Sequence, residues 1–168
     1  GPTGLPNPSG VEVVPVETAA EMLAACRAAL PVDVAVCAAA VSDWTAAHPA
    51  ASKLKKVPGG APPTLSLSET PDILKTLSAP GPERPRLVIG FAAETDRLIE
   101  HAHEKRHRKG CDWILGNDVS PATGTFGGAD NTVHLICGNG VEDWPRMSKT
   151  EVAERLVLRI ADALEARP

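Results

Sequence analysis

Three short apolar runs, separated by segments with helix-forming patterns, constrain the fold more than any other feature of this sequence. The runs span residues 32–40, 87–91 and 112–116, and aliphatic side chains dominate each of them. Runs of this kind are typical of strands that lie in a parallel sheet with helices on both faces. Aromatic residues make up only 3% of the chain and Tyr is absent, so the core must be built from aliphatic side chains, which suits such a sheet.

Helix signals lie between and after these runs. Capping-box patterns begin at Thr18 and Ser148, Thr70 precedes a Pro at a helix start, and Gly110 follows a long polar helix pattern. The predicted helices span residues 18–30, 70–77, 94–109 and 148–166. Strands that alternate with helices favour a parallel sheet with right-handed crossovers.

The remaining strand candidates are shorter. They comprise residues 11–16, residues 64–68, and a hairpin of residues 132–137 and 141–144 around a Gly-Asn-Gly turn. The predicted fold class is therefore α/β, with a Rossmann-like parallel sheet, flanking helices and an added antiparallel hairpin at one edge. Neither an internal repeat nor a dividing linker is visible, so we predict a single domain over residues 1–168.

Charge and cysteine usage exclude several classes of protein. The net charge of -4 argues against a general nucleic-acid binder. The four cysteines form no CxxC pair and no His cluster has zinc spacing, so no metal site is predicted and a reducing, cytoplasmic setting is favoured. We see neither a membrane-spanning segment nor a signal peptide.

Candidate ligand contacts follow the apolar runs. In open parallel sheets, ligands bind beyond the carboxyl ends of the strands. Those ends are predicted at residues 39–43, 90–95 and 116–118, where small residues let a ligand approach the backbone. Asp43 could hydrogen-bond a ribose or hold a cation, although a lone Asp is more often a turn or cap residue.

Several basic residues are candidate phosphate contacts. Lys53 lies in a long loop over residues 44–63, where lysines can close over a phosphate, but a solvated basic loop is the simpler interpretation. Lys105 and Lys109 share a helix face and could clamp a triphosphate, or could instead form a solvated helix end. Pro71 and Asp72 open a helix whose amides favour anions, or are ordinary helix-start residues.

The order of these motifs along the chain resembles the phosphopantothenoylcysteine synthetase family, the CTP-dependent phosphopantothenate–cysteine ligases of coenzyme A biosynthesis. The resemblance covers residues 1–165. It is carried by residues 38–44 (AAAVSDW), 53–56 (KLKK), 70–74 (TPDIL), 90–95 (GFAAET), 105–120 (ending GNDVS) and 126–131 (FGGADN). It implies ligation of 4′-phosphopantothenate to cysteine, with CTP and Mg²⁺, through an acyl-cytidylate intermediate. It also implies a homodimer with the later antiparallel strands near its interface, and a fusion to a flavin-dependent decarboxylase domain.

The resemblance also implies roles for individual residues. Lys53 resembles the catalytic flap lysine, and Lys105 and Lys109 resemble triphosphate contacts. The other residues that resemble CTP contacts are Cys37, Ala38, Ala39, Asp43, Pro71, Asp72, Ile73, Leu74 and Phe91.

One departure from the family pattern leaves an alternative open. The family begins with a strand and a Gly-rich segment that ends in an Asn-x-Ser-Ser-Gly-Lys pattern, and this sequence lacks it. We therefore expect a chain that lacks the first βαβ segment, and a catalytically inactive CTP-binding or dimerisation fragment is the alternative to an active ligase. A Rossmann-type oxidoreductase is disfavoured because GxGxxG is absent.

Overall fold

The structure is a computed structural model that describes residues 6–50, 52–56, 59–119 and 130–166. The chain divides into two compact units. The first comprises the residues up to Ala28 together with Ala39–Asp72, and the second comprises Ala29–Ala38 together with the residues from Ile73 onward.

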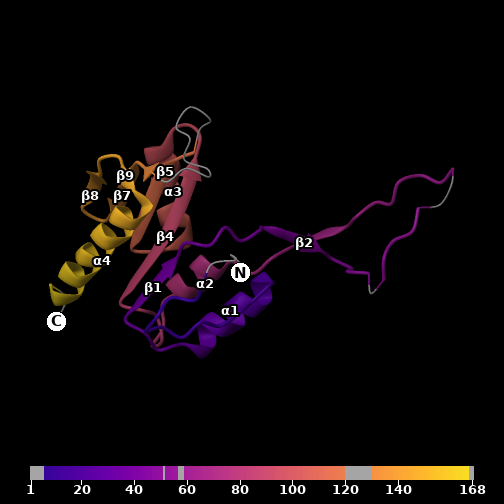
Figure 1. Cartoon of the computed structure of the whole chain (residues 1–168), viewed down its shortest axis with the longest axis horizontal. Coiled ribbons are helices and arrows are strands. Elements are labelled where there is room, and N and C mark those ends of the chain that lie inside the picture. Colours follow the sequence, from indigo (N-terminus) through magenta and orange to yellow (C-terminus); the bar gives the residue numbers. More distant parts are fainter. Residues whose placement is uncertain (1–5, 51, 57–58, 120–129, 167–168) are drawn as a thin grey trace. The chain divides into compact units, whose positions relative to one another are not determined.

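The second unit is built on a five-stranded sheet of order β1-β4-β5-β7-β8 (Figure 1). Its strands are β1 (Val34–Cys37), β4 (Leu87–Glu94), β5 (Trp113–Asp118), β7 (Val133–Cys137) and β8 (Gly140–Asp143). The first three run parallel, whereas β7 is antiparallel to both β5 and β8. The predicted fold class is thus confirmed, including the hairpin at one edge.

Helices cover both faces of this sheet. On one face, α4 (Lys149–Glu165) buries Val152 and Leu156 against Leu87, Leu115 and Leu135. On the other face, α2 (Ile73–Ser78) lies against Gly90 of β4, and α3 (Leu98–Lys109) lies against Gly116 of β5. Because both faces are covered, β4 and β5 are buried along most of their length.

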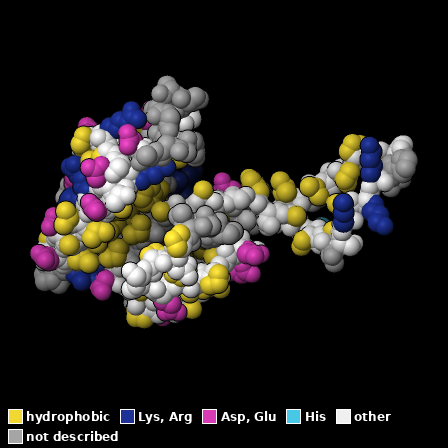
Figure 2. Space-filling model, viewed as in Figure 1, with side chains coloured by type: hydrophobic (Ala, Val, Ile, Leu, Met, Phe, Trp, Pro, Cys, Tyr) yellow, Lys and Arg dark blue, Asp and Glu magenta, His cyan; other side chains and the backbone are white. Residues whose placement is uncertain are grey.

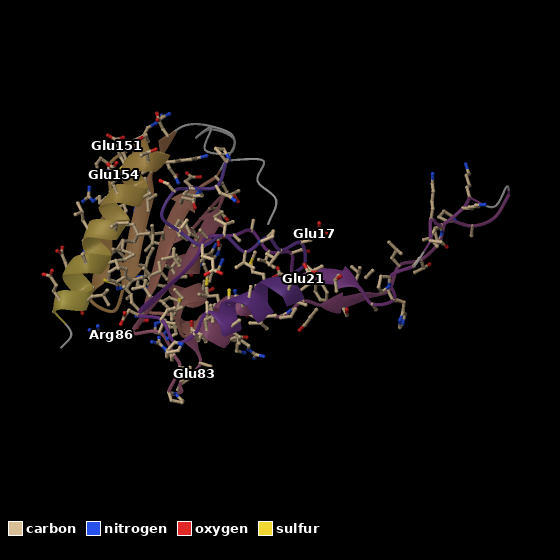
Figure 3. All side chains as sticks on the ribbon, turned by 60° about the horizontal axis from the view of Figure 1, so that its bottom comes forward. Glu17, Glu21, Glu83, Arg86, Glu151 and Glu154 are labelled. Carbon is tan, nitrogen blue, oxygen red and sulfur yellow. The ribbon has the colours of Figure 1, made fainter. Side chains whose placement is uncertain are left out.

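Local capping explains where the helices begin and end. Ser148 accepts a hydrogen bond from the Glu151 N–H (3.2 Å), and the Glu151 carboxylate accepts one from the Ser148 N–H (2.7 Å). Figure 3 marks Glu151 and Glu154 near the start of α4. Gly110 ends α3 in the left-handed region (φ 71°), and its N–H donates to the Arg106 carbonyl. Both capping boxes and this glycine stop agree with the sequence-based predictions.

The first unit contains α1 (Ala19–Ala28) and a two-stranded antiparallel ribbon of β2 (Trp44–Ala46) and β3 (Leu67–Glu69). The α1 capping box forms as predicted, since Glu21 accepts from the backbone N–H groups of Glu17 and Thr18 (Figure 3). Two short strands, β6 (Asp130–Asn131) and β9 (Met147–Ser148), pair antiparallel in the second unit.

Some predicted elements are wrong. Residues 11–16 form no strand, and Val11, Val13 and Val14 are exposed because no neighbouring strand pairs with them among the described residues. The run at 32–40 yields only four strand residues, at the sheet edge rather than in its buried centre, and Val36 is 46% exposed. The helix expected from residue 94 begins at Leu98, because β4 extends to Glu94.

Candidate functional site

The carboxyl ends of β4 and β5 bring polar and small residues together. In register, Ala93 lies beside Asn117 and Glu94 lies beside Asp118. The Val119 N–H donates to the Glu94 carbonyl at 2.9 Å, which extends this pairing by one residue. The Cα positions therefore place an amide and two carboxylates at one edge of the sheet, where ligands bind in open α/β folds.

A His–carboxylate pair lies at the same edge. His101 Nδ1 is 3.5 Å from Glu94 Oε2, and both side chains are about a third exposed, at 32% and 28%. Such a pair can accept a proton or orient a polar ligand. Sequence analysis did not predict this contact, because the residues are seven apart and belong to different elements, a spacing that carries no recognisable pattern.

The N-terminus of α3 also faces this edge, because α3 starts shortly after β4 ends. Its capping residue Arg97 has φ 44° and makes no side-chain cap hydrogen bond. The first amides of a helix have no partner within the helix, and they favour an anion or a polar group. The sheet edge thus combines amide donors, a carboxamide and carboxylates.

Several predicted nucleotide contacts of the second unit are close to Gly90 along the chain or in the sheet register. Cys37, the last residue of β1, is the register partner of Gly90, and Phe91 follows that glycine. A Cβ atom added at Gly90 would lie 2.5 Å from Leu74 Cδ2, so Leu74 packs directly onto the glycine backbone. Leu74 thus packs on the α2 side of the sheet at Gly90, whereas the Phe91 side chain packs against the core cluster on the α4 side. The contacts of Cys37, Ala38, Ile73, Leu74 and Phe91 with a nucleotide stay predictions.

The structure places Lys105 and Lys109 at a distance from this group. The α3 helix leaves the carboxyl end of β4 and delivers the chain to the amino end of β5, so it runs antiparallel to both strands. Lys105 and Lys109 occupy its C-terminal half and lie toward the amino ends of the strands. Their contact with a triphosphate stays a prediction.

The remaining predicted residues belong to the first unit. The Asp43 carbonyl accepts a hydrogen bond from the Thr70 N–H at 3.0 Å, and the Thr70 hydroxyl bonds to the Ser42 carbonyl. These bonds hold Asp43 next to the segment that contains Pro71 and Asp72, at the base of the β2–β3 ribbon. Two of the three boundaries between the units, between Ala38 and Ala39 and between Asp72 and Ile73, lie within the predicted nucleotide-binding motifs.

Lys53 lies in the long connection between β2 and β3. It is exposed, as are Lys55 and Lys56. Figure 2 shows Lys and Arg side chains gathered at the far part of this connection, with hydrophobic side chains nearer the paired strands. The predicted loop is thus anchored by a ribbon that sequence analysis recognised only in part, since residues 64–68 were predicted as a strand and β2 was not.

Metal clusters and membrane-spanning helices are both absent from the described ranges. Within those ranges, no group of three or more His, Cys, Asp or Glu residues is arranged to hold a metal ion. None of the helices in the described part of the chain is long and apolar enough to cross a bilayer. Most of the FGGADN motif, residues 126–129, lies outside the described residues.

Comparison with known proteins relates this architecture to one family. Residues 1–164 match the family model described as the DNA/pantothenate metabolism flavoprotein C-terminal domain. The coenzyme A biosynthesis bifunctional protein CoaBC of Escherichia coli K12 is 39% identical over 160 residues, which is 94% of this chain and 39% of that protein. CoaBC of Bacillus subtilis 168 is 36% identical over 164 residues, 96% of this chain and 39% of that protein. The chain thus spans about two fifths of the length of these relatives.

Solved structures agree with these matches. A crystal structure of the C-terminal domain of CoaBC superposes with a TM-score of 0.75 and 32% identity, covering 98% of this chain and 72% of that one. A DNA/pantothenate metabolism flavoprotein from Streptococcus pneumoniae gives a TM-score of 0.65 at 21% identity, covering 88% of this chain and 68% of that one, which supports the fold alone.

Proposed function

Because the chain belongs to the DNA/pantothenate metabolism flavoprotein C-terminal domain family, we propose that it ligates 4′-phosphopantothenate to cysteine in coenzyme A biosynthesis, using CTP. The observation that carries this proposal is the 39% identity to CoaBC of E. coli across 94% of the chain. Small and polar residues at the carboxyl edge of the sheet support it, because nucleotides bind there in open α/β folds.

The proposed reaction has two steps. The carboxylate of 4′-phosphopantothenate attacks the α-phosphorus of CTP, and the bond to the β-phosphate breaks, which releases pyrophosphate and leaves an acyl-cytidylate. The cysteine amine then attacks the acyl carbon, CMP leaves, and the amine loses a proton as the amide forms. The protein must therefore neutralise a triphosphate, hold a carboxylate in line with it, and accept a proton.

Lys53 is the proposed catalytic residue of the first step. An ammonium group in an exposed loop can close over the nucleotide and offset the negative charge that builds up as pyrophosphate leaves. Lys105 and Lys109 are kept as proposed triphosphate contacts on the resemblance alone, since in this chain they lie toward the amino ends of the strands. The small residues Cys37 and Ala38, together with Leu74 and Phe91, are proposed to line the base and ribose, with Ala39, Asp43, Pro71, Asp72 and Ile73 completing the contacts.

The Glu94–His101 pair suits the second step. A neutral imidazole next to a carboxylate can take the proton that the cysteine amine must lose. The two groups lie 3.5 Å apart at the carboxyl edge of β4, where the acyl-cytidylate would lie if CTP binds as proposed. We assign the pair as the candidate proton acceptor.

The remaining parts of the proposal concern the cofactor and partners. Mg²⁺ in nucleotide sites is generally held by the substrate phosphates with one or two carboxylates, and Glu94 and Asp118 lie side by side at the carboxyl edge. When bound, such an ion neutralises phosphate charge. A homodimer, a fusion to a flavin-dependent decarboxylase domain like that of bifunctional relatives, and a cytoplasmic location complete the proposal.

A paired activity measurement tests this proposal. Pyrophosphate and CMP are quantified with 4′-phosphopantothenate, CTP and Mg²⁺, first without and then with cysteine, on the protein as the cell makes it. Without cysteine, we expect about one pyrophosphate per site and no CMP, because the acyl-cytidylate accumulates. With cysteine, both products should form continuously, and ATP in place of CTP should give far lower rates.

Lysine variants from one loop provide the matched control. Lys53→Ala should lower turnover by at least about 100-fold, the size expected when a group that stabilises transition-state charge is lost. Lys55→Ala removes the same charge from the same exposed loop and should change turnover only a few-fold. Near-normal turnover of Lys53→Ala would show that Lys53 is not catalytic, and equal losses in both variants would show that the loop acts by general charge.

A further inference from the structure

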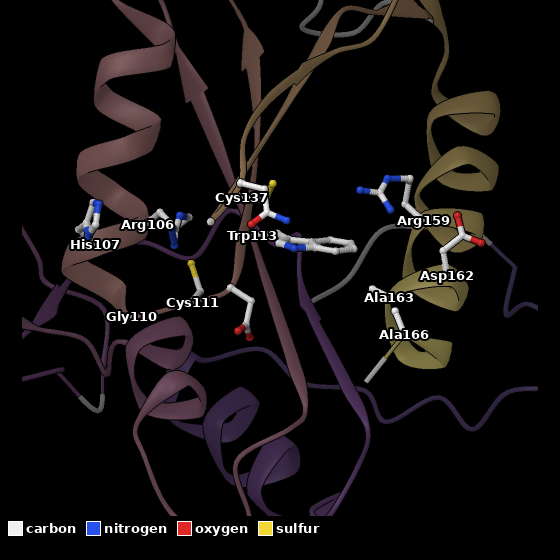
Figure 4. A pocket seen from close by; sticks show the side chains of 13 residues that line it. Arg106, His107, Gly110, Cys111, Trp113, Cys137, Arg159, Asp162, Ala163 and Ala166 are labelled. Atoms are coloured by element: carbon white, nitrogen blue, oxygen red, sulfur yellow. The ribbon is translucent and has the colours of Figure 1, made fainter. Parts of the chain in front are cut away.

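A cavity lies at the amino edge of the sheet, opposite the candidate site. It has a volume of about 650 Å³ and lies entirely within the second unit. Its walls come from the C-terminal end of α3, the start of β5, the turn between β7 and β8, and the last turns of α4 (Figure 4). This volume is within the range of small-molecule sites, roughly 300–1,000 Å³.

Arg106 is the unusual residue of this cavity. Its Nε is buried and has no hydrogen-bond partner among the described residues. The guanidinium lies beside the β7–β8 turn, since its Nη2 is 3.9 Å from the position that a Cβ atom on Gly138 would occupy. The Nε itself has almost no accessible surface, so a ligand in the cavity would bind the outer nitrogens of the guanidinium, for which a carboxylate or phosphate oxygen is the best acceptor.

Two other charged groups of the wall, Asp112 and Arg159, have partners within the protein. Asp112 accepts hydrogen bonds from Arg84 at 2.9 Å and from the Val88 N–H at 2.8 Å. Arg159 bonds to Glu142 through both Nε and Nη2. Asp162 lies on α4, across the cavity from Arg106 (Figure 4). Neither Asp112, which is bonded elsewhere, nor Asp162 accepts a hydrogen bond from the Arg106 Nε.

Charge around the cavity favours an anion on the α3 side. The carbonyl ends of both α3 and α4 face this edge, and helix C-termini disfavour anions. The last turn of α3 offsets this effect because it carries Arg106, His107, Arg108 and Lys109, whereas the last turn of α4 carries no basic residue. An anionic group is thus accommodated next to Arg106 rather than next to α4.

The middle of the cavity offers a small apolar surface, because only 6% of Trp113 is exposed. Trp113 lies between Arg106 and Arg159 (Figure 4), and the Arg159 guanidinium carbon is 5.6 Å from the centre of the Trp113 ring. Cys111 is also neutral, because burial raises the pKa of its thiol to about 11. Alanines 163 and 166 complete the apolar part of the wall.

We propose that this cavity binds a small molecule that carries a carboxylate or phosphate group, with the anionic group on Arg106 and an apolar body against Trp113. The site is separate from the carboxyl edge at which the nucleotide is proposed to bind, and it does not depend on the proposed ligase activity. A ligand there would contact α3, β5 and α4. The opposite ends of α3 and β5 belong to the candidate site.

Nuclear magnetic resonance of the ¹⁵N-labelled protein tests the proposal with two probes, inorganic phosphate and benzoate. The reporter signals are the Arg106 Nε–H and the Trp113 indole N–H, assigned by their loss in Arg106→Gln and Trp113→Phe. We expect saturable shifts of both signals with at least one probe, and not with sodium chloride at equal ionic strength. Phosphate alone would indicate a phosphate ligand, and benzoate alone a carboxylate on an apolar body.

Arg108→Gln is the matched control, since it removes the same charge from the same turn at an exposed position outside the cavity wall. Arg106→Gln should weaken the binding seen at Trp113 by about tenfold or more, the loss expected for a charged hydrogen bond. Arg108→Gln should weaken it less than about threefold, as expected for a screened surface charge. Arg106→Lys keeps the charge and checks folding, and it should bind with intermediate affinity. Absence of saturable shifts at tens of millimolar of either probe, or equal weakening in the Arg106→Gln and Arg108→Gln variants, would overturn the proposal.

Discussion

Replacing Gly90 with Ala tests how tightly α2 packs against the central strand. The added Cβ would lie 2.5 Å from Leu74 Cδ2 and 2.9 Å from Ile114 Cδ1. Carbon atoms in van der Waals contact stand about 3.5–4.0 Å apart, so one or both side chains must move by roughly 1 Å. Leu74 is also one of the predicted nucleotide contacts. The substitution is therefore expected to disturb both the packing of α2 and the candidate site.

The expected loss follows from two opposing effects. Overpacking a filled core destabilises by about 1–3 kcal/mol. Replacing Gly by Ala within a strand recovers about 0.5–1 kcal/mol, because the unfolded chain loses conformational freedom. We therefore expect Gly90→Ala to lower the free energy of unfolding by about 1–2 kcal/mol, or to lower the melting temperature by about 2–8 °C.

Urea unfolding followed by tryptophan fluorescence measures this loss. Trp113 and Trp144 are both buried in the second unit, and Trp44→Phe removes the signal of the exposed tryptophan in the first unit. Gly81→Ala is the matched control, because no atom lies within 4 Å of its added Cβ and its φ is not left-handed, so its stability should stay within about 0.5 kcal/mol of wild type.

A double substitution isolates the contact with Leu74. Leu74→Ala removes the Cδ atoms that the new methyl group would meet, so in that background Gly90→Ala should cost about 1 kcal/mol less than in the wild type. Equal costs in both backgrounds, or a Gly90→Ala protein as stable as Gly81→Ala, would refute the packing argument.

Two further predictions concern α4, which covers the face of the sheet opposite α2 and α3. The hydrogen bond from Arg159 lowers the pKa of Glu142 in the folded protein. The pair therefore contributes stability that is fully present above the unfolded pKa of about 4.3. This stability is lost as the pH falls through the lowered pKa of the folded state. Glu142→Gln should then destabilise by about 0.5 kcal/mol near pH 7, since the pair is about a third exposed, and by almost nothing near pH 3, as measured by urea unfolding at both pH values. A loss of the same size at both would contradict the electrostatic origin. Ser148→Ala removes the capping side chain of α4 and should cost about 1 kcal/mol in the same assay, whereas an unchanged midpoint would show that tertiary packing alone fixes the helix start.

Local signals in the sequence predicted several helix boundaries of this fold, whereas the start expected at Thr70 was wrong because α2 begins at Ile73. The Thr18 and Ser148 capping boxes and the Gly110 stop depend on residues within one helical turn of each other, so tertiary contacts cannot easily override them. Helix starts without such a signal were less predictable. The α3 start was placed at residue 94, because nothing in the sequence reveals that β5 offers pairing partners as far as Glu94.

Strand burial depends on neighbours that the sequence does not identify. The run at 32–40 is as apolar as the run at 87–91, yet β1 lies at the sheet edge and β4 lies between two strands. The valines at 11–16 have a strand-like composition but no partner in the described structure. Composition therefore indicates which segments suit a strand, whereas the order of strands in the sheet decides which of them are buried.

In the candidate site, the direction of a crossover helix adds a constraint that single motifs do not carry, since it follows from the order of strands and helices along the chain. A helix between two parallel strands starts at their carboxyl edge and ends at their amino edge. Lysines in its C-terminal half, Lys105 and Lys109, must then lie away from the carboxyl edge, whereas His101 in its first turns lies close to it. The same geometry places Arg106 at the amino edge, next to the cavity. The direction of α3 therefore separates Lys105 and Lys109 from a triphosphate at the carboxyl edge of the same chain, whereas it brings Arg106 to the ligand proposed for the cavity.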